Sequence, residues 1–324
     1  MNNFLLKTFV ALIGLILSTS ALAQDPEFSQ FYANPLYLNP AFAGSNNCPR
    51  IALNYRNQWP AISGNFITQN VSYDQRLGYN KGAGIGFMVN NDVAAKTLST
   101  LNASAIFSYH LPITRKFALR VGFQATFFQR KLDWNKLNFG DMIDPRRGFV
   151  YNTNDVPVGN GVKSGVDFSA GILGFSETFF FGFAAHHVTE PNQSLVLSNA
   201  TNLPMKLTGH AGAVIPLQKS RYKKVDTKIS PNILYRSQGG AQQLNLGVYV
   251  NKGPIWTGVW YRNGDAFIVL LGIQTDLIRL GYSYDVTTSQ LSLQSGGSHE
   301  VSFGMNFTCK PPKKKYRTIS CPSF

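Results

Sequence analysis

The stretch of sequence that decides the fold covers residues 28–59 and reads FSQFYANPLYLNPAFAGSNNCPRIALNYRNQW. Its first half is aromatic and is interrupted by Pro35 and Pro40, which lack an amide donor and push the residue before each toward extended geometry. Its second half, residues 50–56, alternates cleanly like a strand. The first half is therefore predicted to be an irregular lead-in whose aromatic side chains must be buried against another surface. The rest of the chain is predicted to supply that surface.

An export signal precedes this stretch. Lys7 gives a positive start, residues 9–17 are apolar, and residues 21–23 (Ala-Leu-Ala) form a small-residue cleavage motif before Gln24. Because the apolar run is too short for a spanning helix, we predict a Sec-type signal peptide over residues 1–23. No later run approaches the ~18 apolar residues of a spanning helix, which leaves a secreted globular protein or an outer-membrane barrel.

The composition favours the barrel. The chain has 13% aromatic residues, 14% charged residues and 29 glycines, whereas soluble domains average about 25% charged residues. The net charge of +14 is concentrated in predicted turns and in the C-terminal tail. Since the chain is exported, we expect no nucleic-acid partner, and the basic surface is expected to meet outer-membrane lipid or acidic partners.

Almost every segment after Arg50 has a period of two. In residues 117–128, for example, Phe117, Leu119 and Val121 alternate with small or polar residues. Each run has about ten residues, which is the length of a tilted strand that crosses a membrane. The runs are 50–58, 66–75, 82–91, 98–110, 117–130, 165–173, 179–187, 205–215, 227–236, 243–251, 254–262, 266–273, 277–285 and 299–307. They predict an all-β fold, a transmembrane antiparallel β-barrel of about 14 strands over residues 50–308, after a lead-in over residues 24–49.

The connections support this strand count. If the N-terminus is periplasmic, odd-numbered connections lie outside the cell and even-numbered ones in the periplasm, where turns are short. Three long connections are odd-numbered: 131–164, 188–204 and 286–298. Three tight connections are even-numbered: 174–178, 251–253 and 274–276. The exception is the even-numbered connection 217–226, which is longer and strongly basic.

Closure of the barrel predicts where two of the three cysteines lie. An open sheet edge is not viable in lipid, so the last strand is expected to pair with the first. Cys48 precedes the first strand and Cys309 follows the last, so the two would lie on neighbouring strands at the periplasmic rim. A disulfide between them is plausible in the periplasm, and a pair of Cys309 with Cys321 remains open. No His or Cys cluster has ligand spacing, so we expect no metal and no cofactor.

Charged residues in the strands should face the lumen, because charge on a lipid-facing position is costly. They are Arg56, Asp74, Arg120, Asp167, Arg236, Arg262, Arg279, Asp285 and Glu300. They could line a substrate or ion path, or they could pair in a closed interior, and we favour the closed interior. The lead-in is the candidate plug, with the aromatic residues Phe28, Phe31, Tyr32, Tyr37 and Phe42.

Enzymatic signatures are weak. A serine hydrolase needs a Ser, a His and a carboxylate in one place, and the sequence has no GxSxG motif. The histidines are therefore interpreted as strand-end residues: His110, His186, His187, His210 and His299. Gly82, Gly84 and Gly86 resemble a phosphate loop, but no lysine or helix follows, so they are expected to make room for a close neighbour. We expect a protein that is not an enzyme.

Three blocks of the sequence resemble the PorP/SprF family of type IX secretion system outer-membrane proteins from Bacteroidota. They are FSQFYANPLYLNPAFAG, CPRIALNYRNQWP and KKKYRTISCPSF, and residues 39–44 and 54–59 carry the most specific likeness. The resemblance covers the whole mature chain. It implies a non-enzymatic barrel that assists secretion or surface attachment of a type IX cargo protein, such as a gliding adhesin with a C-terminal sorting domain. It also implies contacts with periplasmic or peptidoglycan-associated components.

Two surfaces are candidates for these contacts. The longest outer connection is expected to contact cargo through Asp141, Asp144, Arg146 and Arg147. The basic tail over residues 309–324 is expected to dock periplasmic components through Lys313, Lys314, Lys315 and Arg317. The alternative is an outer-membrane transporter for a hydrophobic or small solute with the lead-in as a hatch. A weaker alternative is an outer-membrane lipid hydrolase that uses one of the histidines.

Overall fold

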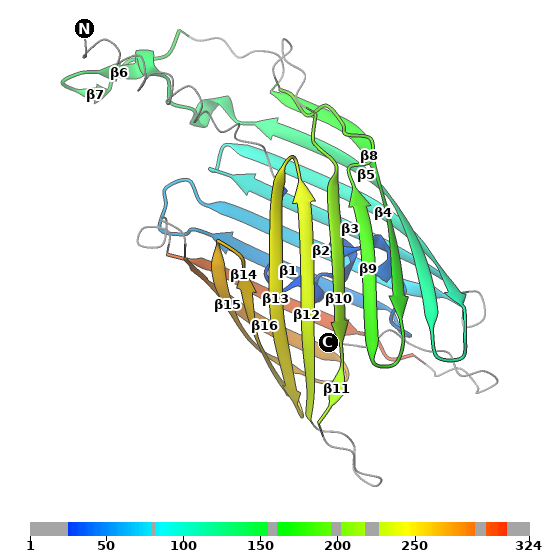
Figure 1. The fold of residues 1–324 in the computed structure, drawn as a ribbon. Coiled ribbons are helices and arrows are strands. Elements are labelled where there is room, and N and C mark those ends of the chain that lie inside the picture. The colour runs from blue at the N-terminus through cyan, green and yellow to red at the C-terminus, as the bar shows by residue number, and fades with distance from the viewer. Residues whose placement is uncertain are drawn as a thin grey trace, which may run out of the picture.

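A computed structural model describes residues 25–78, 82–154, 161–195, 202–217, 227–288 and 296–309. The predicted signal peptide over residues 1–23 and the tail from residue 310 onward lie outside these residues. Within the described part, fourteen long strands form one closed antiparallel β-barrel, as predicted (Figure 1). Every predicted run coincides with one of these strands.

The barrel strands follow one another around the wall in sequence order. They are β1 (Arg50–Gln58), β2 (Phe66–Leu77), β3 (Ala83–Ala94), β4 (Leu98–Pro112), β5 (Ala118–Leu132), β8 (Val162–Phe175), β9 (Phe179–His186), β10 (Lys206–Ala213), β12 (Thr227–Gln238), β13 (Ala241–Lys252), β14 (Ile255–Arg262), β15 (Ala266–Gln274), β16 (Ile278–Thr287) and β17 (Ser298–Asn306). The short strand β11 (Ile215–Pro216) continues β10 along β12. The connection between β5 and β8 contains the 3-10 turns η3 (Trp134–Lys136) and η4 (Gly140–Met142) and a small hairpin of β6 (Ile143–Asp144) and β7 (Gly148–Phe149).

The barrel closes through the first and last strands, as predicted. β1 pairs with β17 over its whole length, from Arg50 opposite Asn306 to Gln58 opposite Ser298. Since both neighbours of every strand in the wall are barrel strands, most backbone groups are satisfied within the sheet.

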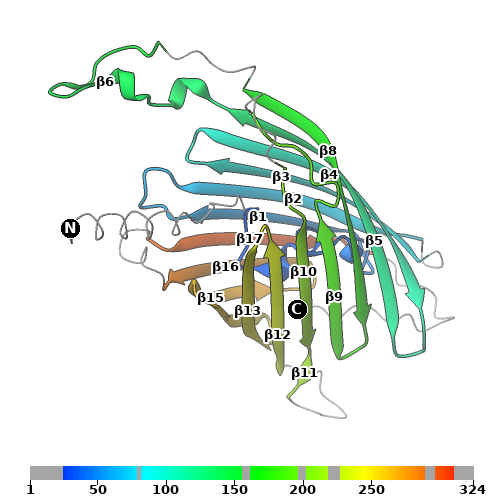
Figure 2. The same ribbon diagram turned by 45° about the horizontal axis from the view of Figure 1, so that its top comes forward.

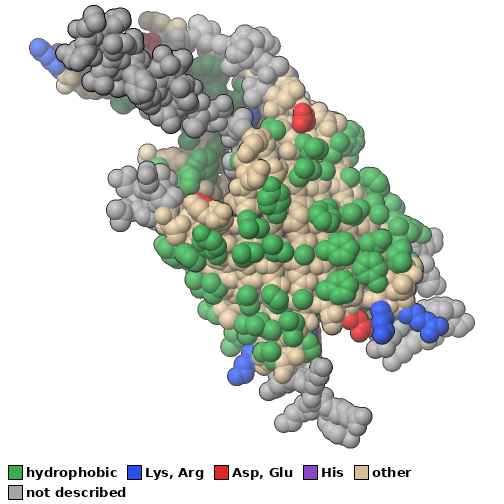
Figure 3. Space-filling view, in the orientation of Figure 1, with side chains coloured by type: hydrophobic (Ala, Val, Ile, Leu, Met, Phe, Trp, Pro, Cys, Tyr) green, Lys and Arg blue, Asp and Glu red, His purple; other side chains and the backbone are tan. Residues whose placement is uncertain are grey.

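The two faces of the wall differ as a membrane barrel requires. Outward positions carry exposed apolar side chains, among them Phe123, Phe183 and Leu271, and they form a broad apolar surface (Figure 3). Inward positions carry buried polar side chains such as Thr68, Ser104 and Asn245. None of the short helical turns in the described residues could span a bilayer.

The odd-numbered connections all lie at one end of the barrel, which we call the outer end; the opposite end, where β1 begins, is the inner end. The wall is uneven in height. β4 and β5 have 15 residues each, whereas β14 has 8. The tall side carries the β5–β8 connection away from the barrel mouth (Figures 1 and 2).

The lead-in has no helix or strand longer than four residues, as expected of an irregular segment, but it contains three short helical turns that were not predicted. It forms the turns η1 (Phe31–Ala33), α2 (Pro35–Leu38) and η2 (Pro40–Phe42). Both prolines occupy the first position of a turn, where the missing amide donor costs nothing and the fixed φ favours a helical start. Asn39, directly before Pro40, is extended as predicted, and its side chain accepts a hydrogen bond from the Ala41 amide. Asn34, directly before Pro35, is not extended, since its ψ is 68°.

Candidate functional site

The lead-in lies inside the barrel, and its aromatic side chains face the lumen wall. Phe28, Phe31, Tyr32 and Phe42 are buried, while Tyr37 is partly buried. Phe28 and Tyr37 pack edge-on against each other at 5.2 Å between centroids, and the other three pack against rings of the wall. The ring pairs are Phe31 with Trp260 at 4.8 Å, Tyr32 with Phe180 at 5.6 Å and Phe42 with His210 at 5.5 Å between centroids. Burial of each ring contributes about 1.5–3 kcal/mol to holding the segment in place.

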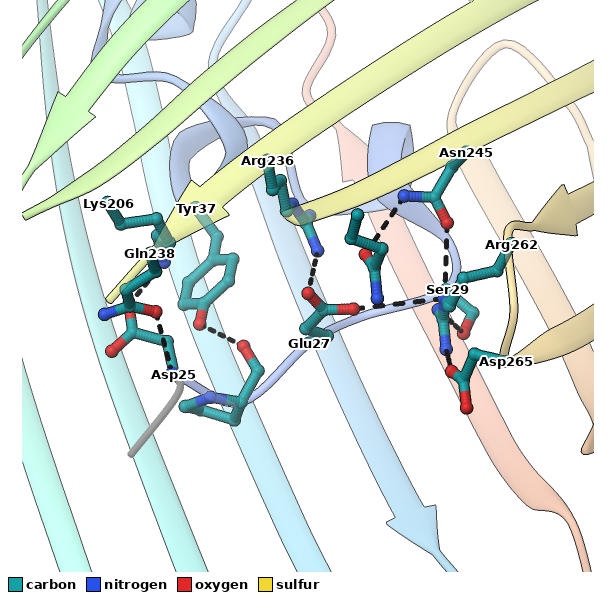
Figure 4. Close-up of polar contacts among 12 residues, drawn as sticks. Asp25, Glu27, Ser29, Tyr37, Lys206, Arg236, Gln238, Asn245, Arg262 and Asp265 are labelled. Carbon is teal, nitrogen blue, oxygen red and sulfur yellow. Dashed lines mark hydrogen bonds and ion pairs between the residues drawn. The ribbon is translucent and has the colours of Figure 1, made fainter. Parts of the chain in front are cut away.

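At the outer end, the lead-in begins in a charged cluster around Asp25 (Figure 4). The Asp25 carboxylate contacts His187 Nε2 at 2.8 Å and also pairs with Lys206, while the Asp25 amide donates to Gln238 at 3.0 Å. His187 Nδ1 lies 2.7 Å from Asp167. His187 has a φ of 58°, a left-handed conformation that is unusual for a residue with a side chain. This backbone turn directs the imidazole between the two carboxylates.

Four charged side chains surround Ser29, and all four lie toward the outer ends of their strands. Its amide donates to Glu300 at 2.6 Å, and its hydroxyl donates to Asp285 at 2.6 Å. Arg56 and Arg262 donate to the same hydroxyl at 2.6 and 3.0 Å. Arg56 also pairs with Asp285 at 2.9 Å and with Glu300 at 3.4 Å. The cluster joins β1, β14, β16 and β17 to one residue of the lead-in.

Glu27 adds a second ionic contact beside this cluster (Figure 4). Its carboxylate lies 3.3 Å from Arg236 and 3.9 Å from Arg262. Arg262 in turn pairs with Asp265 at 3.1 Å, near the outer rim. The lead-in is thus held by buried charges on β12 and β14 as well as across the seam of β1 and β17.

At the inner end, the last residues of the lead-in are held by their backbone. The Ala43 carbonyl accepts hydrogen bonds from Ser108 at 2.6 Å and Arg120 at 2.7 Å. The Gly44 amide donates to Asp74 at 2.8 Å. The segment therefore runs the length of the lumen, from His187 and Lys206 near the outer end to Asp74 and Arg120 near the inner end.

The strand glycines make room for the lead-in, as predicted for Gly84 and Gly86. A Cβ at Gly84 would collide with the Ala43 carbonyl oxygen, and one at Gly86 would lie 3.0 Å from Leu36 Cδ1. Gly82, directly before β3, has a φ of +62°, and a Cβ there would lie 2.9 Å from the His110 carbonyl oxygen, so it also makes room for a close neighbour. No phosphate loop is formed by these residues, since β3 continues from them as a strand.

The nine charged strand residues lie on the lumen side of the wall, as predicted. Eight of them are buried to 8% exposure or less, and Arg279 stacks on the Trp256 ring at 4.6 Å. Their partners differ from the simple ion pairs that we expected, because the lead-in takes part. Arg120 donates a hydrogen bond to a backbone carbonyl of the lead-in. Arg56 and Arg262 donate to Ser29 of the lead-in, and Arg236 pairs with its Glu27.

Two cavities meet the lead-in from opposite ends. The outer cavity has a volume of about 440 Å³ and is lined by Asp25, Glu27, Arg130 and Trp59, among others. The inner cavity has a volume of about 270 Å³ and is lined by Tyr32, Phe42, Arg50 and Arg279, among others. The lead-in contributes to the lining of both, so it lies between them.

The five histidines have separate surroundings. His110 is buried 5.8 Å from the Phe175 ring, and His299 contacts the Tyr282 hydroxyl at 2.7 Å. His186 lies 3.4 Å from the Leu38 carbonyl, and His210 stacks on Phe42. His187 contacts two carboxylates, as described above. In the described part of the chain, no group of His, Cys, Asp or Glu side chains could hold a metal ion.

The structure joins Cys48 to Cys309 in a disulfide with a Cα–Cα distance of 5.6 Å. It lies at the inner end, where β1 begins and β17 ends. Cys321 lies outside the described residues. So do the tail residues Lys313, Lys314, Lys315 and Arg317, and most of the basic connection between β11 and β12.

In the β5–β8 connection, the two predicted acidic residues organise the loop itself. Asp144 accepts hydrogen bonds from the amides of Arg146 at 2.8 Å and Arg147 at 2.9 Å, and these bonds lower the pKa of its carboxyl. Asp141 accepts from the Asn154 amide at 2.7 Å, which likewise lowers the pKa of Asp141. Arg146 and Arg147 are exposed.

Sequence reasoning missed an apolar surface on the same connection, which we call the apolar hairpin. Ile143, Phe149, Val150 and Tyr151 are all exposed there, Phe149 to 62%. The hairpin projects beyond the barrel mouth (Figure 2), so lipid-facing strand positions do not explain these side chains. The run Phe-Val-Tyr at 149–151 was the available signal, and its place in a long polar connection hid it.

Comparison with known proteins gives one family and several barrels. The family model described as "Type IX secretion system membrane protein PorP/SprF" matches residues 20–305. No curated protein matches the sequence at a significant level. The Ralstonia pickettii toluene transporter TbuX is similar in structure, with a TM-score of 0.48, 10% identity and coverage of 88% of this chain and 96% of that chain. The Acinetobacter baumannii outer membrane protein Omp33 has a TM-score of 0.45, 6% identity and coverage of 82% and 100%. Likeness at this level supports no functional assignment.

Proposed function

Because the chain belongs to the PorP/SprF family of type IX secretion system membrane proteins, we propose that it is a non-enzymatic outer-membrane barrel that binds a secreted cargo protein at its outer end. In this role it assists secretion or surface attachment of a cargo with a type IX C-terminal sorting domain, such as a gliding adhesin. Periplasmic or peptidoglycan-associated components of the secretion system are its partners on the other side.

One observation carries this proposal: residues 25–44 occupy the lumen between the two cavities. The segment is bonded to the wall toward the outer end through Asp25 and Ser29, and at the inner end through Ala43. Breaking buried charge contacts of this kind costs about 3–5 kcal/mol each. A barrel whose lumen is filled in this way is better suited to bind a partner at its exposed surfaces than to pass a solute through its lumen.

The apolar hairpin is the surface that best suits a protein partner. Exposed aromatic and aliphatic side chains that have no lipid to face are typical of interaction sites. Arg146 and Arg147 lie between its two strands and add positive charge at its tip. We therefore assign cargo contact to the apolar hairpin and to these two arginines, with Asp141 and Asp144 shaping the loop.

The test is affinity purification of the tagged full-length protein from detergent-solubilised outer membranes, with bound proteins identified by mass. We expect the wild type to recover a large surface protein that carries a type IX sorting domain. The variant Phe149→Ser with Tyr151→Ser should recover much less of it. Ile113→Ser is the matched control, since Ile113 is 56% exposed in the β4–β5 connection at the inner end. Absence of any such protein from the wild-type sample would overturn the proposal.

The basic tail is proposed to dock the periplasmic components. Deletion of residues 310–324 should remove those components from the purified sample and leave the cargo in place. Retention of both after the deletion would contradict this assignment.

A transporter with the lead-in as a hatch is the second candidate, and the two cavities are the observation that favours it. They would become one channel if the lead-in moved aside. This candidate predicts that solute uptake falls when the lead-in is fixed to the wall, whereas the binding role predicts no effect of fixing it.

A further inference from the structure

The wall of the barrel has a gap in its pairing beside β8. β8 pairs with β5 along its length, from Ala118 opposite Phe175 to Lys131 opposite Val162. With β9 it pairs only from Phe175 to Ala170. Residues 162–169, the outer half of β8, therefore have a sheet neighbour on one side only within the described part of the chain.

The direction of each backbone group on this half can be assigned from bonds at its ends. The Gly161 carbonyl accepts from Leu132, so odd-numbered residues face β5. The Phe168 carbonyl accepts from Val188, so even-numbered residues face the other side. The backbone groups of Val162, Ser164 and Val166 thus point to the open side, where no bond to another described residue is made.

The chain after β9 does not cover this edge with its described residues. After Val188, the Thr189 hydroxyl donates to Asp167 at 2.8 Å, and the Gln193 side chain accepts from Arg130 at 3.3 Å. Asp167 and Arg130 belong to the lumen side, and Gln193 lines the outer cavity. The described residues that follow Val188 are therefore folded into the barrel mouth, away from the edge of β8.

The open edge lies where the apolar belt ends. Next to Val166, the outward residue of β5 is Phe127, but next to Ser164 and Val162 the outward residues are Gln129 and Lys131. Polar side chains among apolar ones mark the upper border of the lipid. An unpaired strand edge is not tolerated in the hydrocarbon of the membrane. Beyond the lipid border, an unpaired edge is a template on which another strand can pair.

We propose that the outer edge of β8 receives an extended segment of the secreted partner, which adds to the barrel wall as a strand. This inference rests on the proposed function and names how the partner binds. Main-chain bonds to Val162, Ser164 and Val166 hold the segment. Its outward side chains are apolar, to match the exposed Val162, Val166 and Phe168, and a polar or acidic side chain faces Lys163.

The apolar hairpin supports this choice of a protein partner over lipid. The hairpin lies within the β5–β8 connection, and β8, which carries the open edge, follows directly after that connection. A protein held by the edge would therefore lie at the same end of the barrel as the apolar hairpin (Figure 1).

The test compares Ser164→Pro with Ser164→Ala in the purification described above. Proline at 164 removes an amide that faces the open side and leaves the β5 ladder intact, so the barrel should fold. Recovery of the partner should fall by about tenfold or more with Ser164→Pro, which corresponds to a loss of about 1.4 kcal/mol or more of binding free energy. Recovery should stay unchanged with Ser164→Ala. Equal recovery by both variants overturns the inference.

Amide exchange gives a second readout that does not depend on the proline variant. In the wild-type complex, the amides of Ser164 and Val166 should be protected relative to the free barrel, while those of Lys163 and Gly165 are protected in both. Unchanged exchange at Ser164 and Val166 overturns strand addition while the partner is still bound. Failure of the wild type to bind any secreted protein instead overturns the proposed function, so the two failures are distinguishable.

Discussion

The amide of Ser29 donates a 2.6 Å hydrogen bond to Glu300, a residue 271 positions later in the chain. Glu300 stands on the last strand, directly opposite Arg56 on the first, and Arg56 donates to the Ser29 hydroxyl. One residue of the lead-in thus binds both strands of the seam that closes the barrel. The position of the lead-in and the closure of the barrel are therefore energetically linked.

Glu300→Ala should destabilise the barrel strongly. It leaves Arg56 with one carboxylate fewer and leaves the Ser29 and Gln30 amides without their acceptor. Loss of one partner of a buried ion pair costs about 3–5 kcal/mol. The temperature at which the folded barrel is lost, followed by gel mobility after heating, should fall. Asp265→Ala is the control, because the Asp265 side chain is 43% exposed and its loss should cost under about 1 kcal/mol. Equal effects of the two changes would contradict the linkage.

Gly122→Ala should displace the lead-in. A Cβ at Gly122 would collide with the backbone of Pro40 and Ala41, and overpacking of this kind costs about 1–3 kcal/mol. Gly209→Ala is the matched control, since its Cβ would meet Phe183 at an ordinary 3.5 Å. Proteolysis of residues 25–44 in the folded barrel should become faster in the first variant alone. Resistance of both variants would show that the segment is not packed against β5.

Reduction of the Cys48–Cys309 disulfide should lower the thermal stability of the barrel. The bond spans 261 positions and fastens the ends of the first and last strands, and disulfides typically contribute about 2–4 kcal/mol. Cys48→Ser should have the same effect as a reductant, and Cys321→Ser should have none. A stability loss with Cys321→Ser that equals the effect of a reductant would indicate that the cysteines pair differently in the cell.

Asp144→Ala should loosen the apolar hairpin. The Asp144 carboxylate holds the amides of Arg146 and Arg147, and its pKa is lowered by these bonds. The contribution is therefore present above the ordinary value of about 3.9 and is lost only as the pH falls through the lowered pKa. At neutral pH, trypsin should cleave after Arg146 and Arg147 faster in Asp144→Ala than in the control Lys136→Ala. Equal cleavage rates would mean that Asp144 does not order the loop.

The strands could be predicted because a lipid face opposite a polar lumen face imposes a period of two on almost every one of them. All fourteen were found, although the continuously apolar run in β15 does not reveal which of its faces points to the lumen. The last residues of β4 and β5 and both ends of β8 were missed because the predicted bounds followed the clean alternation, and these strands continue beyond it. The turns of the lead-in were missed because Pro35 and Pro40 were interpreted as breakers rather than as starts.

The lumen contacts could be predicted only in part. Charge on a strand must face inward, so the location of Arg56 and Glu300 followed from the sequence. Their common partner Ser29 did not, because the path of the lead-in depends on which side chains meet across the closed barrel. The role of His187 was missed for the same reason, since its left-handed backbone is set by the connection that follows β9.

The central claim is that the protein works through its outer surfaces while residues 25–44 stay in the lumen. Ala43→Cys with Gly86→Cys tests it in a Cys321→Ser background, because a Cβ at Gly86 would lie 3.4 Å from the Ala43 Cβ, close to disulfide range. The measurement is the amount of partner protein on the cell surface, with and without a reductant, and Gly86→Cys alone is the control. We predict the same surface display in the oxidised and reduced cells. Loss of display on oxidation, with recovery on reduction, would contradict the account and show that the lead-in must move.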